Sequence, residues 1–340
     1  MAKGCPAPRS FHPACDKGEA PLRPEVPTTL LPHFPFDRDT WSMHMGIRSL
    51  REDEPVFEVS GQREEALALK ARLLEQDAPT YSGERPGSRA LQWEALGMGA
   101  RILARQHPEH FGVEREGETY HFIERKTGEV TTFTEGDDVS LPCSPLEWLG
   151  RRVEEDVMVL DGNDPAIPLV AGCLCFPSMW SLQQNLGRSF EQIHQPVPHF
   201  AEKIGRSSRL LMEWLKPSYP VTRLNWGMYP TTRLDLTPGS LPEWEAAYEG
   251  IDEDNAGERV HLRIERQVLL RLPRTHGIFF TIHIWVGSIA EQLGVPGRAA
   301  RIAEQLHSLP EDTERYKRLA PFREPLITWL RRRAELPAPA

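Results

Sequence analysis

The sequence of 340 residues lacks any apolar run long enough to cross a bilayer. Its most apolar stretch, residues 277–290, is interrupted by Thr281, His283 and Ser288. That stretch is shorter than the ~20 apolar residues that a spanning helix needs. Residues 1–29 also lack the apolar segment of a signal peptide. These absences predict a cytoplasmic protein that does not bind membranes.

Cysteine is scarce, with five residues in all, and an odd number does not suit a disulfide framework. No C-x-x-C-H motif occurs, which argues against covalently attached c-type haem. Cys173 and Cys175 form a C-x-C pair on a predicted strand, but no second cysteine or histidine pair stands at zinc spacing. We therefore expect both to be small buried residues.

Common catalytic and nucleotide-binding signatures are absent as well. No G-x-G-x-x-G follows a strand, and neither G-x-x-x-x-G-K-[ST], G-x-S-x-G nor H-E-x-x-H occurs. The formal net charge of −9 argues against nucleic-acid binding, because a nucleic-acid partner requires a basic surface. The content of 39% apolar and 26% charged residues is typical of a globular protein.

Composition divides the chain into three regions. Residues 1–35 are rich in proline and small polar residues, and we expect an irregular arm there. Residues 36–333 carry the periodic apolar patterns and are expected to form a single domain. Residues 334–340 are predicted to be a flexible tail.

Apolar periodicity predicts the elements of this domain. Helical spacing marks residues 61–76, 88–107, 199–215 and 296–333. Alternation and turn residues mark a hairpin at 113–135 and strands at 157–160, 167–176, 221–229, 259–272 and 278–286. Helices thus come first, then strands and short helices, then three antiparallel strands. This order favours an α+β fold over an alternating βαβ fold.

Residues 171–200 are the most informative stretch. Ser178 is a plausible N-cap and Gly187 a C-cap, while Ser189 and Gln192 have the spacing of a capping box. We therefore expect two short helices, the second ending at His194 because Pro196 disfavours helical geometry before it. His194 lies on an apolar stripe. That placement leaves open both a structural histidine and a metal ligand.

Several motifs resemble one known family. They are Gly150-Arg151 with Glu155-Asp156, CFPSMW at 175–180, IHQPVP at 193–198, Arg223-x-Asn225-Trp226, and RIERQVLLRLPRTHGIFFTIHIW at 263–285. In this order, from about Met43 to about Trp329, they resemble the haem-dependent oxidative N-demethylase alpha-subunit-like family, typified by a dimethylamine-oxidising haem oxygenase. Residues 51–59 depart from the family's usual tryptophan- and aspartate-containing lead.

The resemblance implies a fold and an activity. It implies a PAS-like antiparallel sheet core with flanking helices and an N-terminal helical extension. It also implies non-covalent haem b with a histidine axial ligand to the iron. The implied reaction removes an N-methyl group from a small methylated amine as formaldehyde, using O2. Electrons would come from NADPH through partner flavin or iron–sulfur subunits.

Applied to this sequence, the resemblance makes His194 the expected axial ligand, with His199 as the second choice. Arg266 falls on the apolar face of its strand and needs an anion, either a haem propionate or a buried carboxylate such as Glu155 or Asp156. Arg223 and Asn225 could likewise meet propionates or belong to a structural network.

Two residues are candidates for the reaction itself. Glu265 could bind a substrate ammonium through a charge-assisted hydrogen bond, or it could be an ordinary ion-pair residue. Thr281 shares a strand face with His283 and Trp285, and any of the three could lie on the distal side of the haem. A PAS-like haem sensor without turnover is the alternative function, and a haem-free relative is a third.

Overall fold

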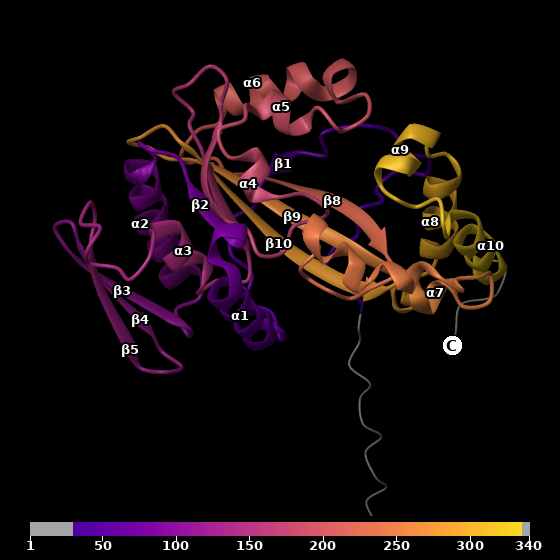
Figure 1. The fold of residues 1–340 in the computed structure, drawn as a ribbon, viewed down its shortest axis with the longest axis horizontal. Helices are drawn as coiled ribbons and strands as arrows, with labels where there is room; N and C mark the ends of the chain where they lie inside the picture. The colour runs from indigo at the N-terminus through magenta and orange to yellow at the C-terminus, as the bar shows by residue number, and fades with distance from the viewer. Residues whose placement is uncertain (1–29, 335–340) are drawn as a thin grey trace, which may run out of the picture.

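The computed structural model describes residues 30–334, which form an α+β fold around one large antiparallel sheet (Figure 1). The strand order of this sheet is β1-β8-β9-β10-β6-β7-β2. Its strands are β1 (Arg48–Ser49), β2 (Ser82–Glu84), β6 (Asp156–Leu160), β7 (Leu169–Cys173), β8 (Val221–Tyr229), β9 (His261–Arg271) and β10 (Ile278–Ser288). The predicted α+β class is confirmed.

A second sheet and three helices stand at one end of the large sheet (Figure 1). The small sheet comprises β3 (Phe111–Glu116), β4 (Thr119–Glu124) and β5 (Glu129–Thr134). The helices are α1 (Arg63–Tyr81), α2 (Arg89–Gln106) and α3 (Pro145–Gly150). The predicted hairpin at 113–135 thus becomes a three-stranded meander, with Gly117 and Gly128 at positive φ in its turns.

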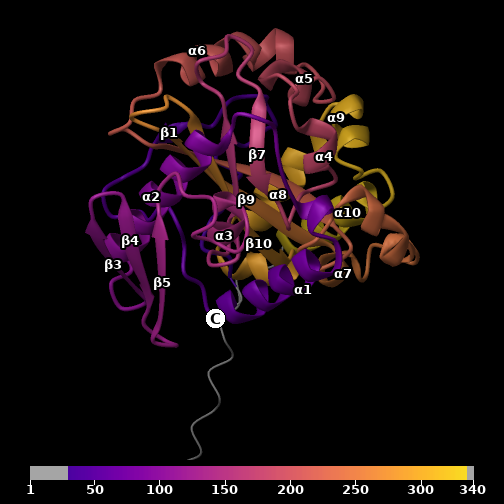
Figure 2. The ribbon, with the colours of Figure 1, turned by 60° about the vertical axis from the view of Figure 1, so that its left-hand side comes forward.

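The remaining helices cover the large sheet and its far end. They are α4 (Leu182–Asn185), α5 (Phe190–His194), α6 (Arg206–Trp214), α7 (Ala256–Arg259), α8 (Arg298–His307), α9 (Glu311–Tyr316) and α10 (Arg323–Ala334). In both ribbon views α5 and α6 lie over the same side of the sheet, while α8–α10 stand at the end away from β3–β5 (Figures 1 and 2).

The centre of the sheet is a meander inserted beside a hairpin. Strands β8, β9 and β10 are consecutive antiparallel neighbours, and β10 then pairs with β6 of the β6–β7 hairpin. The helices α4–α6 belong to the connection between β7 and β8. This topology brings the last strand of the meander next to the first strand of the hairpin. The connection from the hairpin to the meander, which carries α4–α6, can therefore lie over the sheet.

Local structure differs from the expectations in four further places. The predicted helical region at 296–333 divides into α8, α9 and α10. The N-cap of α4 is Ser181, so the prediction of Ser178 is wrong; Ser178 instead bridges to Leu236. Helix α1 continues beyond residue 76, although Asp77 breaks its geometry two residues before Pro79. The predicted helix at 199–215 begins with a π-helical turn, Ala201–Gly205, before α6.

Two apolar clusters hold these layers together. One lies among α1–α3, the small sheet and the β6–β7–β10 side of the large sheet. The other joins the β8–β9 end to α8 and α10, and it includes Leu31 and Phe36 from the first described segment. The predicted arm at 1–35 and tail at 334–340 lie mostly outside the described residues. Within residues 30–334, no helix is long and apolar enough to span a bilayer.

Candidate functional site

The central strand β9 is buried along most of its length, yet it carries four charged residues at 263–266 and 271. Directly paired residues of antiparallel strands point to the same face of the sheet. The register therefore separates two sets of polar side chains. We call the first set face A; it contains Arg223 and Asn225 of β8, Glu265 and Gln267 of β9, and Ile282 and Ile284 of β10. Face B contains Arg266, Thr281, His283 and Trp285.

Hydrogen bonds connect the polar side chains of face A in a chain. The Arg223 guanidinium donates to Gln267 Oε1 at 3.0 Å, and Gln267 Nε2 donates to Glu265 Oε2 at 2.8 Å. Asn225 Nδ2 donates to the same Glu265 oxygen at 3.1 Å. The structure thus brings together three of the predicted site residues. Glu265 Oε1 has no hydrogen-bond partner among residues 30–334, so it remains open to a ligand.

His194 is the last residue of helix α5, which fixes its position. The predicted capping box at Ser189 and Gln192 is present and fixes the start of the helix. His194 Nδ1 lies 2.8 Å from the Phe190 carbonyl oxygen, which can only accept, so Nδ1 carries the proton and Nε2 keeps its lone pair. Phe200 stacks on the imidazole at 4.5 Å between ring centroids. No described residue forms a hydrogen bond with Nε2.

Electrostatics connects His194 to face A. Burial lowers the pKa of His194, and the nearby positive charge of Arg223 lowers it further, so the neutral imidazole is favoured. Burial also lowers the pKa of Arg223, whose nearest opposing charge, Glu265, acts only from a distance. Arg223 Nε donates to the Met45 carbonyl at 2.8 Å. Among the described residues Arg223 has no carboxylate within ion-pair distance.

His199 differs from His194 in every respect that matters for metal binding. It is exposed and has a positive φ of 58°. Its Nε2 lies 2.6 Å from Asp312 Oδ2, and its Nδ1 lies 3.4 Å from Glu202 Oε2. Both ring nitrogens are therefore engaged, and the residue links the segment after α5 to α9.

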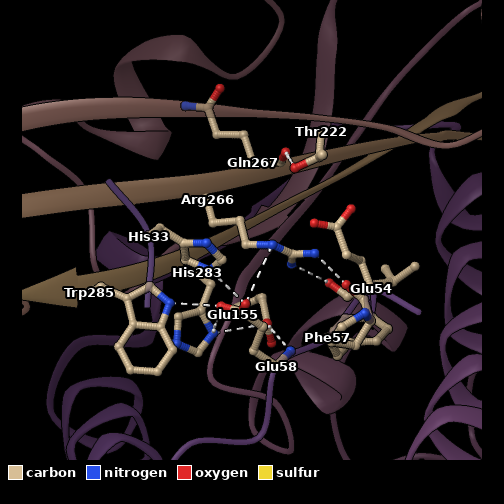
Figure 3. A network of polar contacts seen from close by, with 12 residues as sticks. His33, Glu54, Phe57, Glu58, Glu155, Thr222, Arg266, Gln267, His283 and Trp285 are labelled. Carbon is tan, nitrogen blue, oxygen red and sulfur yellow. Dashed lines mark hydrogen bonds and ion pairs between the residues drawn. The ribbon is translucent and has the colours of Figure 1, made fainter. Parts of the chain in front are cut away.

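Face B holds a second, separate network (Figure 3). Arg266 lies 3.5 Å from Glu58 Oε1 and donates to the carbonyl oxygen of Pro55 at 2.5 Å. His283 Nδ1 lies 2.9 Å from Glu155 Oε1, and Trp285 Nε1 donates to Glu58 Oε2 at 2.7 Å. Of the two expected partners, a haem propionate or a buried carboxylate such as Glu155 or Asp156, the structure has a carboxylate, but it is Glu58 and neither of the two named.

The predicted site residues are therefore only partly brought together. Arg266 and Thr281 project from face B, whereas Arg223, Asn225 and Glu265 project from face A. The Thr281 hydroxyl is fully buried and has no hydrogen-bond partner within the described part of the chain. His283 and Trp285, which the sequence left as possible distal residues, belong to the same network as Arg266.

Polar residues of β9 and β6 hold the CFPSMW run in place. Arg263 donates to Ser178 Oγ at 2.9 Å and to the Phe176 carbonyl at 2.7 Å, which fixes the CFPSMW run. Asp156 accepts the backbone N–H groups of Cys175 and Phe176, at 2.8 and 2.9 Å. Cys173 and Cys175 are buried, as expected.

Sequence reasoning missed Lys317, which follows α9. Its Nζ donates to the Trp226 carbonyl oxygen at 2.6 Å and lies 4.2 Å from the centroid of the Trp226 ring. Burial lowers the pKa of Lys317 to about 8; the charge of Glu265 opposes this shift, and the positive charge of Arg223 adds to it. A lone lysine after a short helix gives no signal in a sequence, because its place beside β8 depends on tertiary packing.

The residues around face A fit a haem group. A haem iron takes a neutral imidazole nitrogen, and His194 offers Nε2 with its other nitrogen fixed by a carbonyl. Haem propionates need cations, and Arg223 is a desolvated cation without an ion pair among the described residues. The macrocycle needs apolar contacts, and Ile282 and Ile284 continue the face across β10.

A comparison with known protein families identifies the family of this chain. The family described as haem-dependent oxidative N-demethylase, alpha subunit-like, matches residues 46–327. The match covers most of the chain, including all the strands of the large sheet and the α5 histidine. Its description names a haem-dependent oxidative activity and one subunit of an assembly. The chain therefore belongs to the haem-dependent oxidative N-demethylase alpha subunit-like family.

Proposed function

We propose that this protein binds haem b non-covalently over face A and oxidatively demethylates a small methylated amine such as dimethylamine. The observation that carries the proposal is the state of His194. Its Nδ1 is fixed by the Phe190 carbonyl, and its Nε2 is left without a partner among residues 30–334. In histidines that bind metals, the ring nitrogen that does not bind the metal is typically held by a hydrogen bond in this way.

Two features favour His194 over His199 as the axial ligand. Both nitrogens of His199 face carboxylates, so ligation would break an ion pair. In contrast, His194 would form its iron bond without losing any hydrogen bond. The stacked Phe200 ring restricts rotation of the imidazole, so its orientation is set before a ligand arrives.

The reaction that we propose balances as follows. An N-methylamine, O2, two electrons and two protons give the demethylated amine, formaldehyde and water. Haem supplies the activation of O2 when it is bound. The protein's own residues bind the amine, exclude water and hold the ligands in place.

Glu265 is the residue that we assign to substrate binding. Its Oε2 is held by two amide donors, Asn225 and Gln267, which fix the carboxylate on face A. A secondary ammonium could then donate to Oε1 in a charge-assisted hydrogen bond. The carboxylate would also draw the N-methyl group toward the same side of the sheet as His194.

The PAS-like nature of the fold is part of the proposal. A hairpin, a helical connection and a three-stranded meander form one sheet, with the last strand of the meander beside the first strand of the hairpin. That order, with the histidine in the helical connection, supports a PAS-like haem domain. Residues 30–81 supply the N-terminal extension around it.

The electron source lies outside this chain in our proposal. The family description names an alpha subunit, which supports electron delivery by partner subunits. We propose that NADPH electrons arrive through a flavin or iron–sulfur partner, in the cytoplasm. A haem sensor without turnover is the competing function.

Turnover separates these two functions. Purified protein with haem, a chemical reductant, O2 and dimethylamine should release formaldehyde in proportion to the amine consumed, and Glu265→Gln should slow the release. Stable O2 or carbon monoxide binding without formaldehyde from any methylamine would refute the enzyme and favour the sensor. Absence of haem binding altogether would favour a haem-free relative.

A further inference from the structure

We propose that Lys317 and Arg223 form a two-cation site that binds the paired carboxylates of a haem-type ligand at the β8 edge of face A. The inference rests on the proposed function, because the ligand is the haem that His194 would coordinate. It adds Lys317, the residue that follows α9, to the site residues of the sheet. It also fixes which edge of the macrocycle faces β8.

The first observation is the environment of Lys317. Its Nζ contacts the Trp226 carbonyl and the Trp226 ring, and neither carries a negative charge. No carboxylate lies within ion-pair distance among residues 30–334. A lysine that is half-buried beside neutral groups is costly unless an anion neutralises it. Desolvation accordingly lowers its pKa to about 8.

The second observation is that Arg223, three residues before Trp226 on β8, is also a cation without an ion pair among the described residues. Its partners are the Met45 carbonyl and the Gln267 side-chain oxygen, both neutral. Arg223 and Trp226 project to opposite faces of β8, but Lys317 Nζ lies at the Trp226 carbonyl, on the edge of the strand where the two faces meet. The Asp312–His199 pair also holds α9 beside the segment that follows α5. After burial, the charge of Glu265 favours protonation of Lys317 and the charge of Arg223 disfavours it, so two cations share one carboxylate and still repel each other. A doubly anionic ligand would remove this repulsion.

The third observation is the gradient of polarity across face A. In the register, Arg223 is followed by Gln267 and then Ile282 across the three strands, and Asn225 by Glu265 and then Ile284. The face is therefore polar at β8 and β9, with its cation at β8, and apolar at β10. An apolar ring with two carboxylates along one edge matches this gradient if the carboxylates point to β8.

A structural role for Lys317 is the competing explanation. Strand β1 pairs only with residues 221 and 222, so Lys317 could serve only to satisfy the edge carbonyl of Trp226. If Lys317 binds the ligand, the ligand must carry a free carboxylate. If Lys317 is only structural, esterifying the ligand should not change its affinity. Only a carboxylate site distinguishes a free propionate from an esterified one.

The test is a titration of the full chain, freed of haem, with iron protoporphyrin and with its dimethyl ester. Wild type should bind the free acid at least about tenfold more tightly than the ester, since one charge-assisted hydrogen bond is worth about that much. Lys317→Met should weaken binding of the free acid about tenfold and leave ester binding unchanged. Lys317→Arg should restore the preference, and Lys216→Met, at an exposed lysine, should leave both unchanged.

A measurement on wild type covers the case in which Lys317→Met does not fold. The pKa of Lys317, followed by NMR of 13C-labelled lysine, should rise when the free acid binds and stay unchanged with the ester. An unaltered preference in Lys317→Met, or an unmoved lysine pKa, would overturn the inference while haem binding stands. Wild type that binds neither porphyrin would instead overturn the proposed function.

Discussion

At the scale of single residues, the chemistry of His194 is set by one backbone carbonyl. The Phe190 oxygen lies 2.8 Å from Nδ1 and selects the tautomer in which Nε2 can bind a metal. His199, five residues further on, has no ring nitrogen left for a metal, because two carboxylates contact its ring. Two histidines in one short segment therefore differ through their partners and not through their sequence context.

Glu265 is the residue that separates amine binding from haem binding. Replacing it by glutamine removes the charge but keeps the shape, so KM for dimethylamine should rise about tenfold or more, with haem affinity unchanged. Amine-dependent changes in the haem spectrum give the same constant independently of turnover. Glu75→Gln, at an exposed position on α1, is the control and should leave KM as it is. Equal KM values in Glu265→Gln and wild type would remove Glu265 from the substrate site.

The face B network makes stability depend on pH. Neighbouring carboxylates, Glu155 and Glu58, raise the pKa of His283 despite its burial, and Arg266 and His33 also adjoin the network. A raised pKa means that the imidazolium stabilises the fold fully below about pH 6.5 and that this contribution is lost as pH rises through the folded-state pKa.

Glu58 acts at the acidic end of the range. Its pKa is lowered to about 2, against desolvation, by His33, His283 and Arg266. Its contribution is therefore present above about pH 4.5 and is lost as pH falls toward 2.

Urea unfolding of wild type and His283→Gln should show a free-energy difference that is largest near pH 6 and smaller near pH 9. A difference that stays constant across this range would contradict the network's charge assignment.

At the scale of elements, β9 organises the molecule because its polar side chains each hold a different segment. Arg263 fixes residues 176–178, Arg266 fixes residues 55–58, and Arg271 donates to the carbonyls of Met212 and Leu215 at the end of α6. The sequence predicted this strand and the odd placement of Arg266 in it. It could not predict Glu58 as the partner, because the two residues lie far apart in the chain and meet only through the fold.

Helix α5 is short, so its capping box carries much of its stability. Ser189→Ala removes the side-chain acceptor for the Gln192 N–H and should cost the helix about 1 kcal/mol. If His194 coordinates haem, the release of haem to an excess of a haem scavenger should become about fivefold faster, which is the same free energy expressed as a rate. Ser207→Ala, at an exposed position on α6, is the matched control. Identical release from both variants would mean that the cap does not position the ligand.

At the scale of the whole molecule, the closing contacts come from segments that are distant in sequence. The His199–Asp312 pair joins the segment after α5 to α9, and Lys317 joins the same C-terminal region to β8. The sequence predicted the order of the elements and the position of His194 at the end of a short helix. It did not predict which side of the sheet each polar residue faces relative to the helices, because that follows from packing. This is why Arg266 and Thr281 were grouped with residues of the other face.

The C-terminal helices are tied to the sheet through a close contact between α7 and α10. A Cβ atom at Gly257 would lie 2.0–2.3 Å from ring atoms of Trp329, which is buried. Gly257→Ala should therefore lower the free energy of unfolding by about 1–3 kcal/mol through overpacking. Gly239→Ala has no atom within 4 Å of the new Cβ and should change it little. Equal thermal midpoints for the two variants would show that α10 can shift away from α7 freely.

The most direct test of the whole account is the absorption spectrum of haem-supplemented wild type beside His194→Ala, with His199→Ala as the control. The account predicts a Soret band typical of histidine-ligated haem in wild type and in His199→Ala. It predicts a shifted or lost band in His194→Ala, restored in part by added imidazole. An unchanged spectrum and haem content in His194→Ala would contradict the assignment of this histidine as the iron ligand.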